Sequence, residues 1–312
     1  MRRLEKSYGK KSYAHFSSEF KRTGDSECIS LASYQTDPVE AATDFWEVHE
    51  YRELIERIAF LGAMNKRLTL FYRGQTKDWK IMPSISRSSW QSPFAARDKY
   101  PLQNHVVDYW RFLNETLGPK VYDICRRKGI PRWRGLKMYR DAKFSVIQHY
   151  ELWPTPLIDI TQNLRVACSF ALPKCEKEGF LYVLGLPAST HSITFDADQH
   201  IVLARLQAVC PPIAKRPHYQ DGFLVGRFPF DGPNGRNFER HNLGMRLLAK
   251  FKLLNLNSFW SDDFPCISYG ALLPKDDALG EEFEHVFGPN GQMSVDRAAS
   301  SIARPSGLSG QG

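Results

Sequence analysis

The sequence lacks long apolar runs and closely spaced cysteines. None of its apolar segments approaches the roughly 20 residues that span a bilayer, and the polar start, Met1 to Lys6, has no apolar region of a signal peptide. The six cysteines include no Cys-x-x-Cys pair, which argues against a zinc ribbon. We therefore expect a cytoplasmic protein in a reducing compartment, with no membrane partner and no metal.

The sequence also lacks an internal repeat, and its composition is typical of a folded globule. Its 312 residues are 42% hydrophobic and 13% aromatic, enough for one large core or two modest ones. Four parts are predicted along the chain: a polar segment at 1–36, a main domain at 37–230, a helical and apolar extension packed on it at 231–288, and a disordered tail rich in Ser, Gly and Ala at 289–312.

Periodicity predicts helices and strands within these parts. Asp37-Pro38-Val39-Glu40 is typical of a helix start. The helix that follows is predicted to end at Gly62 and to have one apolar face, formed by Tyr51, Leu54, Ile55, Ile58 and Leu61. Residues 90–145 are predicted to be mainly helical, and another helix is predicted over about 240–254. The predicted strands are 180–186, 201–206 and 222–228.

The first motif is an arginine at the end of a short apolar strand. Leu70-Phe71-Tyr72 leads directly to Arg73 and Gly74, and Gln75 follows. A buried arginine is costly unless an anion or a carboxylate meets it. Gly74 allows the backbone to approach a bound group closely. The motif predicts either an anion-binding arginine or a structural salt bridge.

The second motif extends from Gln148 to Ala171 and is predicted to form a strand, a turn and a helix. The strand covers 156–160, capping oxygens follow at 161–163, and apolar residues then recur at helical spacing. Polar side chains at such a corner, here Asp159 and Thr161, are often ligand contacts. His149 is interpreted as a ligand contact, a base or a satisfied semi-buried histidine. Asp159 contacts substrate, orients Arg73 by an ion pair, or does both.

These two motifs together resemble the FRG domain, a family named for a Phe-Arg-Gly motif. Here that motif reads Phe71-Tyr72-Arg73-Gly74, with one residue inserted. The family's Gln-His-Tyr-Gly-x-Pro-Thr-x-Leu-x-Asp-x-Thr block is matched by Gln148, His149, Tyr150, Pro154 (offset by one), Thr155, Leu157, Asp159 and Thr161. A third element is matched less closely by Arg216, Gln220, Gly222 and Leu224. The resemblance covers roughly 40–230.

The order of these motifs is also similar to that of Arg-Ser-Glu ADP-ribosyltransferases. This similarity implies an α+β fold, with an ADP-ribosyltransferase-like mixed or antiparallel sheet flanked by helices, and NAD as a substrate. Arg73 would hold the diphosphate. The implied catalytic residues are Arg73, Asp159, Thr161 and Gln220, and the implied NAD contacts are Tyr72, Arg73, Gly74, Gln75, His149, Tyr150 and Thr155.

The sequence departs from the transferases on a later strand. Residues 219–225 contain no Glu-x-Glu, so Gln220 or Asp221 would replace the usual glutamate. Another carboxylate source lies downstream, at Glu281, Glu282 and Glu284, although an exposed helix start explains these three equally well.

A basic segment precedes the second motif. It contains Arg126, Arg127, Arg132, Trp133 and Arg134. Cations interleaved with rings are typical of single-stranded nucleic-acid sites, and a solvated helix face is the alternative interpretation. Because the segment comes just before the second motif, we expect it to border the pocket.

Two function classes follow. The chain is either an ADP-ribosyltransferase-like enzyme that modifies an acceptor, plausibly RNA or DNA, or a catalytically inactive module that binds a nucleotide or nucleic acid. The family resemblance further implies a bacterial toxin or phage-defence effector, restrained by an antitoxin or inhibitor protein. The absent Glu-x-Glu favours the module, whereas the intact Arg-Gly and Asp-x-Thr positions favour the enzyme. A plain scaffold ranks third, because it leaves the polar corner unexplained.

Overall fold

A computed structural model describes residues 13–14, 21–22, 29–30, 45–86, 111–131, 133–227, 243–255 and 259–287. The predicted disordered tail and most of the polar N-terminal segment lie outside these residues. In the described parts of the chain, no helix is both long enough and apolar enough to cross a bilayer.

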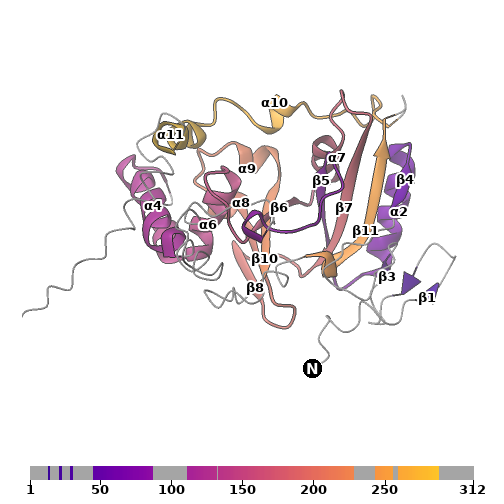
Figure 1. Cartoon of the computed structure of the whole chain (residues 1–312), viewed down its shortest axis with the longest axis horizontal. Coiled ribbons are helices and arrows are strands. Elements are labelled where there is room, and N and C mark those ends of the chain that lie inside the picture. The colour runs from indigo at the N-terminus through magenta and orange to yellow at the C-terminus, as the bar shows by residue number, and fades with distance from the viewer. Residues whose placement is uncertain are drawn as a thin grey trace, which may run out of the picture.

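An eight-stranded mixed sheet forms the centre of the molecule (Figure 1). All neighbouring strands pair antiparallel except β4 and β11, which pair parallel. The spatial order is β4 (Trp46–Val48), β11 (Leu247–Leu254), β7 (Glu178–Leu186), β5 (Thr69–Gln75), β6 (Ile158–Thr161), β10 (Gly222–Arg227), β9 (Ile201–Arg205) and β8 (Ile193–Asp196). The α+β class predicted from the sequence is confirmed.

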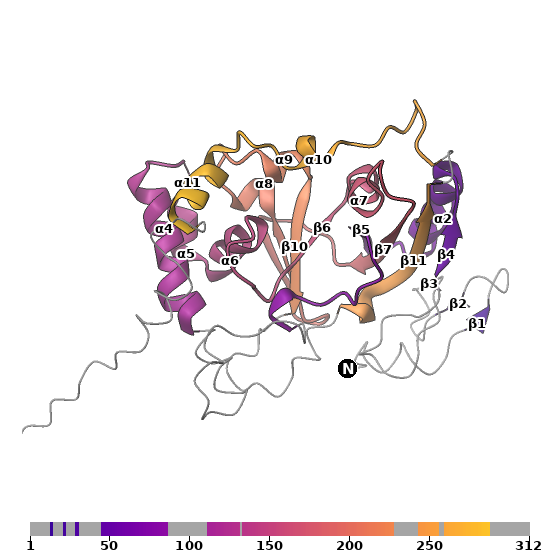
Figure 2. The ribbon, with the colours of Figure 1, turned by 45° about the horizontal axis from the view of Figure 1, so that its top comes forward.

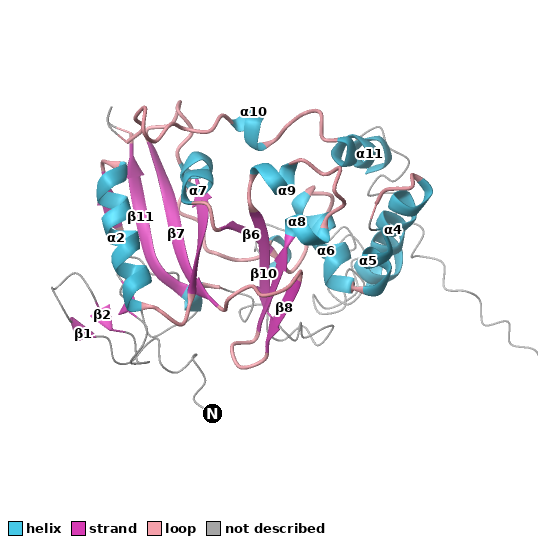
Figure 3. Ribbon diagram, turned by 180° about the vertical axis from the view of Figure 1, so that it is seen from behind, coloured by secondary structure: helices cyan, strands magenta, loops and turns pink. Residues whose placement is uncertain are grey.

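Helices cover both ends of this sheet (Figures 1 and 3). At one end lie α2 (Tyr51–Met64) and a small sheet of β1 (Tyr13–Ala14), β2 (Lys21–Arg22) and β3 (Ile29–Ser30). At the other end lie α4 (Gly118–Arg127), α5 (Trp133–Met138), α6 (Arg140–His149) and α11 (Ala278–Phe287). The remaining α-helices of the described residues are α7 (Leu164–Ala171), α8 (Leu206–Val209), α9 (Arg216–Tyr219) and α10 (Tyr269–Leu272).

Three buried apolar clusters hold these layers together. One lies between α2, α7 and one face of the sheet, a second fills the opposite face, and a third joins α4, α6 and α11 to β9 and β10. The main predicted strands are confirmed as β7, β9 and β10, and the described part of 90–145 is helical as predicted.

The prediction of a helix over about 240–254 is wrong for the described residues. Residues 247–254 form β11, which lies inside the sheet between β4 and β7. The strand is buried on both faces, including Lys250, which is only 2% exposed. Its ammonium pairs with Asp78 at 2.8 Å, and Asp78 also accepts from the Tyr182 hydroxyl at 2.7 Å. A buried lysine can lie in this strand because a carboxylate meets it.

The helix predicted to follow Asp37 starts later than expected. Residues 46–48 form β4, and α2 begins at Tyr51, while residues 37–44 lie outside the described residues. The apolar face is confirmed at Leu54, Ile58 and Leu61. The helix ends at Met64 instead of Gly62, since Asn65 bonds back to the Leu61 carbonyl through its backbone N–H (3.0 Å) and its side-chain amide (2.8 Å).

Helix α7 packs directly against the backbone of β5 and β7. A Cβ on Gly74 would lie 1.9 Å from the Ala167 carbonyl oxygen, and a Cβ on Gly179 would lie 1.9 Å from that of Ala171. Both glycines therefore serve helix–sheet packing. For Gly74 this differs from the sequence interpretation, in which the missing side chain made room for a bound group.

Gly74→Ala should destabilise the fold by about 3 kcal/mol or more, because backbone atoms of α7 cannot move away from the new methyl without shifting the helix. Thermal denaturation measures the change. Gly135→Ala is the matched control, since a Cβ there meets nothing within 4 Å, and alanine favours the helix that contains it. Equal melting temperatures for the two variants would contradict the close packing of α7.

Candidate functional site

A cleft opens where β5 and β6 diverge. These strands share one register pair, Tyr72 with Thr161, whereas β5 pairs with β7 along its whole length. The cleft has a volume of about 240 Å³. Its lining comes from β5, β6, α7 and the end of α6, and from Gln220, Tyr269 and Leu273. Helix α10 contacts both α7 and α9 and lies between them (Figure 2).

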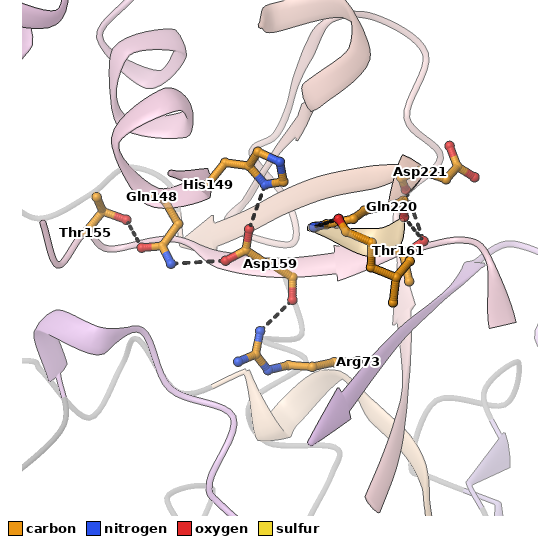
Figure 4. Close-up of polar contacts among 9 residues, drawn as sticks. Arg73, Gln148, His149, Thr155, Asp159, Thr161, Gln220 and Asp221 are labelled. Atoms are coloured by element: carbon orange, nitrogen blue, oxygen red, sulfur yellow. Dashed lines mark hydrogen bonds and ion pairs between the residues drawn. The ribbon is translucent and has the colours of Figure 1, made fainter. Parts of the chain in front are cut away.

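Arg73 lies in this cleft, where hydrogen bonds to Asp159 and Gln75 help to fix its orientation. Its Nη1 donates to the backbone carbonyl of Asp159 at 2.6 Å (Figure 4). Its Nε donates to the Gln75 side chain at 3.3 Å. Gln75 is buried and is anchored to the Trp79 carbonyl at 3.0 Å. As expected from the sequence, Arg73 and Asp159 lie on neighbouring strands and line one cleft.

The Asp159 carboxylate is held by the end of α6. Gln148 Nε2 donates to Oδ2 at 3.0 Å, and His149 Nδ1 lies 3.3 Å from Oδ1 (Figure 4). The Thr155 hydroxyl donates to Gln148 Oε1 at 2.6 Å, which fixes the orientation of that amide. Thr155 is fully buried and is absent from the lining of the cleft, so it positions Gln148 and through it Asp159.

His149 presents a buried nitrogen that lacks a partner. Its side chain is 2% exposed, and Nε2 has no hydrogen-bond partner among the described residues. Because a carboxylate only accepts, Nδ1 carries a hydrogen toward Asp159, and Nε2 of the neutral ring is then an acceptor. A buried polar atom without a partner is costly. His149 lines the cleft, although Nε2 itself is shielded from solvent.

Thr161 lines the cleft, but its hydroxyl bonds to the protein backbone. Its Oγ1 lies 2.8 Å from the Gln220 carbonyl and 3.0 Å from the Asp221 carbonyl, and it accepts from the Asn163 N–H at 3.0 Å (Figure 4). These bonds tie the end of β6 to the start of β10. Thr161, one of the implied catalytic residues, therefore shapes the wall of the cleft.

Gln220 and Asp221, which the sequence offered in place of the transferase glutamate, both bond to groups of the protein outside the cleft. The Gln220 amide donates to the Leu272 carbonyl at 2.9 Å and so anchors α10, although Gln220 does line the cleft. The Asp221 carboxylate accepts from Gln207 at 3.2 Å and is not part of the lining. The start of β10 thus brings no carboxylate into the cleft.

Two tyrosines from the motifs lie on different sides of the site. Tyr72 lines the cleft, and burial, with the Cys168 thiol nearby, raises its pKa to about 12, so its phenol stays protonated at neutral pH. Tyr150 donates instead to the buried Asp277 carboxylate at 3.0 Å. Burial and this carboxylate raise the pKa of Tyr150.

Tyr150 lines a second cavity of about 590 Å³ beside the cleft. Arg216, Lys275 and aromatic residues of α11 also line it. The two cavities share Glu151 and Leu273 in their linings. Of the downstream carboxylates, Glu281 and Glu284 line this second cavity, whereas Glu282 pairs with Lys128 at 2.8 Å. Sequence interpretation missed Glu151, although an acidic residue immediately after the Gln148-His149-Tyr150 motif was a readable signal.

The basic segment lies on α4 and α5, away from the cleft. Arg126 pairs with Asp123 at 3.5 Å, and the Arg134 guanidinium lies 5.1 Å from the centre of the Trp133 ring. Arg127 donates to the Asp123 carbonyl, and Arg132 lies outside the described residues. Neither α4 nor α5 contributes to the lining of the cleft, so the expectation that this segment borders the cleft is wrong.

The described residues include no group of three or more His, Cys, Asp and Glu side chains that could hold a metal ion.

Comparison with known families matches residues 69–179 to the FRG domain. No curated protein and no solved structure matches the chain. The match covers β5 with Arg73 and β6 with Asp159 and Thr161, which are the two strands that form the cleft.

Thr161→Val should lower the free energy of unfolding by about 1–3 kcal/mol, because it leaves the Asn163 N–H and two carbonyls without this hydroxyl. Thr161→Ser, which keeps the hydroxyl, should lose much less. Chemical denaturation of both variants gives the comparison. If valine and serine prove equally stable, the hydroxyl does not hold β6 to β10.

Proposed function

The chain carries an FRG domain at residues 69–179, and from this premise we propose that it is an ADP-ribosyltransferase-like enzyme. In this proposal the cleft binds NAD as a substrate, the bond between nicotinamide and ribose breaks, and ADP-ribose moves to an acceptor. The position of Arg73 is the observation that carries the proposal. It is a guanidinium on the wall of a cleft, held in a fixed orientation by the Asp159 carbonyl and by Gln75.

Arginine suits the diphosphate of NAD for two reasons. Its planar group donates parallel, charge-assisted hydrogen bonds to phosphate oxygens, which a lysine ammonium cannot reproduce. Its orientation is also set before the ligand arrives, which reduces the entropy lost on binding. Tyr72, a neutral donor next to it on β5, adds to this end of the site.

Other residues that line the cleft suit the nicotinamide nucleoside. His149, Phe170 and Tyr269 supply rings on which a planar group can pack. The volume of about 240 Å³ lies below the roughly 300–1,000 Å³ of pockets that enclose a drug-sized ligand. We therefore assign the enclosed space to the nicotinamide riboside half, with the adenosine half extending beyond Arg73.

A second candidate function is a binding module that does not turn NAD over. It is favoured by the start of β10, where the Gln220 amide anchors α10 and Asp221 lies outside the lining of the cleft. The two functions differ in one measurable respect. The enzyme releases nicotinamide from NAD, and the module only binds a nucleotide or nucleic acid.

Arg73→Ala should abolish nicotinamide release while the protein remains folded, and Arg73→Lys should be severely impaired as well. NAD binding should weaken along with the chemistry, because the diphosphate is held before the bond breaks. If the activity is that of a toxin, both variants should also relieve growth inhibition of the host that expresses the protein. Nicotinamide release and melting temperature are measured on the same preparations.

Arg57→Ala is the matched control for Arg73. Arg57 is a partly buried arginine of α2 that pairs with Glu53 at 3.1 Å and lines neither cavity. A folded Arg73→Ala variant with full activity would remove Arg73 from the site and, with it, the enzyme proposal. A purely structural Arg73 would show as a sharp fall in melting temperature with unchanged activity of the remaining folded protein.

We also propose a single-stranded nucleic acid as the acceptor. The basic segment on α4 and α5 supplies cations next to the Trp133 ring. It is joined to the wall of the second cavity, because Lys128 at the end of α4 pairs with Glu282 of α11. A nucleic-acid strand whose phosphates are bound along α4 would thus extend toward that cavity. A neutralising partner protein belongs to the same proposal, as does action in the cytoplasm.

Neutralising Arg126, Arg127 and Arg134 to Gln should weaken binding of a labelled single-stranded RNA and reduce the slope of log K against log salt by about 2, since each lost phosphate contact contributes roughly 0.7. NAD binding should change much less. The control replaces three exposed lysines on other parts of the surface, Lys66, Lys174 and Lys177. If both triple variants have the wild-type slope, the segment is ordinary solvated surface.

A further inference from the structure

Glu151 ends helix α6 in a backbone conformation that favours glycine. Its φ is 53°, in the left-handed region. The Glu151 N–H donates to the Gln148 carbonyl at 3.0 Å, and the Leu152 N–H donates to the Ile147 carbonyl at 3.0 Å. These two bonds define a Schellman ending of the helix, whose left-handed position is usually occupied by Gly or Asn. A side chain with a Cβ is strained there.

The charge of Glu151 is also unfavourable at this position. Carbonyl groups give the C-terminal end of a helix a partial negative charge, which repels a carboxylate. The Glu151 side chain is exposed to solvent, and among the described residues it makes no hydrogen bond or ion pair that offsets this repulsion. The residue therefore weakens the fold through both its backbone and its charge. Strain that persists without local compensation is typical of functional sites.

Glu151 lies at the junction of the two cavities. It lines the cleft together with Arg73, and it lines the second cavity together with Arg216 and Lys275. Asp159 is the other carboxylate in the lining of the cleft, and its oxygens are held by Gln148 and His149. Glu151 is thus the carboxylate of the cleft whose oxygens remain available to a ligand.

The second cavity has the features of a binding site of its own. Arg216 Nε is buried and has no partner among the described residues, and its guanidinium lies 5.6 Å from the centre of the Tyr150 ring. Aromatic rings of Phe283 and Phe287 form part of the wall. A partly buried cation next to rings can receive a planar group that carries hydrogen-bond acceptors.

We propose that Glu151 is the catalytic carboxylate of this protein, and that the acceptor of ADP-ribose enters through the second cavity. The inference rests on the proposed function. In the step, the bond between nicotinamide and C1 of the ribose breaks, and its electron pair leaves with nicotinamide. A hydroxyl or amino group of the acceptor forms the new bond to C1, and its proton passes to Glu151 and then to water.

Electrostatics favours this assignment. The nicotinamide ring of NAD is positively charged, and positive charge moves onto the ribose as the bond breaks. A carboxylate near the ribose stabilises that charge, while Arg73 holds the negative diphosphate. Because Glu151 lines both cavities, one group can stabilise the ribose in the cleft and take the proton of a nucleophile that arrives from the other side.

Three variants test the proposal: Glu151→Gln, Glu151→Gly and His200→Gly. Glutamine keeps the size and the backbone strain but removes the negative charge. Glycine removes both, and should raise the melting temperature by about 2–4 °C. His200 is the matched control, because it is exposed, has a φ of 54° and lines neither cavity. His200→Gly should also raise the melting temperature, with activity unchanged.

The measurements are NAD affinity by calorimetry and nicotinamide release from NAD in the presence of total cellular RNA. Glu151→Gln should bind NAD within about threefold of wild type. Both Glu151 variants should release nicotinamide about 10²–10⁴-fold more slowly, the usual contribution of a general base. This result, with a more stable Glu151→Gly, supports the proposal.

Four other outcomes overturn it. If wild type is active and Glu151→Gln is equally active, Glu151 is not catalytic, although the proposed function stands. If Glu151→Gln no longer binds NAD, the carboxylate serves binding instead of catalysis. If Glu151→Gly melts lower than wild type, the strain argument fails. If wild type itself releases no nicotinamide, the enzyme proposal fails, and the catalytic role of Glu151 fails with it.

Discussion

The hydrogen bond between Arg73 and the Asp159 carbonyl bridges the point where the central sheet divides. Strands β5 and β6 share only the pair of Tyr72 and Thr161, and an eight-stranded sheet with so short a junction needs other links across it. The guanidinium supplies one, 2.6 Å from the carbonyl. The same group therefore closes the base of the cleft and offers its charge to whatever the cleft contains.

Three consecutive residues at the end of α6 contact different parts of the site. His149 contacts the Asp159 carboxylate, lines the cleft and has a buried nitrogen without a described partner. Tyr150 bonds to Asp277 and faces the second cavity. Glu151, in its left-handed conformation, lines both. The end of a single helix thus forms the boundary between the two cavities, and Glu151, the residue with positive φ, lies at that boundary.

The sequence predicted that Arg73 and Asp159 lie on neighbouring strands and line one cleft, whereas parts of the surrounding scaffold were predicted wrongly. Motifs around Arg73 and Asp159 were readable because polar residues at the ends of apolar strands are unusual, and the convergence of the strands follows from them. The prediction for β11 failed, because a strand buried on both faces has no period of two, and its central Lys250 depends on Asp78, which lies far away in the sequence. The role of Gly74 depends on the position of α7, which no local pattern contains. The basic segment precedes the second motif directly in sequence, yet α6 leads the chain away from it before the cleft begins.

A crystal structure of the Glu151→Gln variant with NAD tests the central claim most directly, because this variant should bind the substrate without consuming it. We expect diphosphate oxygens within hydrogen-bonding distance of the Arg73 guanidinium. The nicotinamide ribose should lie between the His149 ring and the side chain of residue 151. NAD bound elsewhere on the protein, with the cleft at β5 and β6 containing only solvent, would contradict the account.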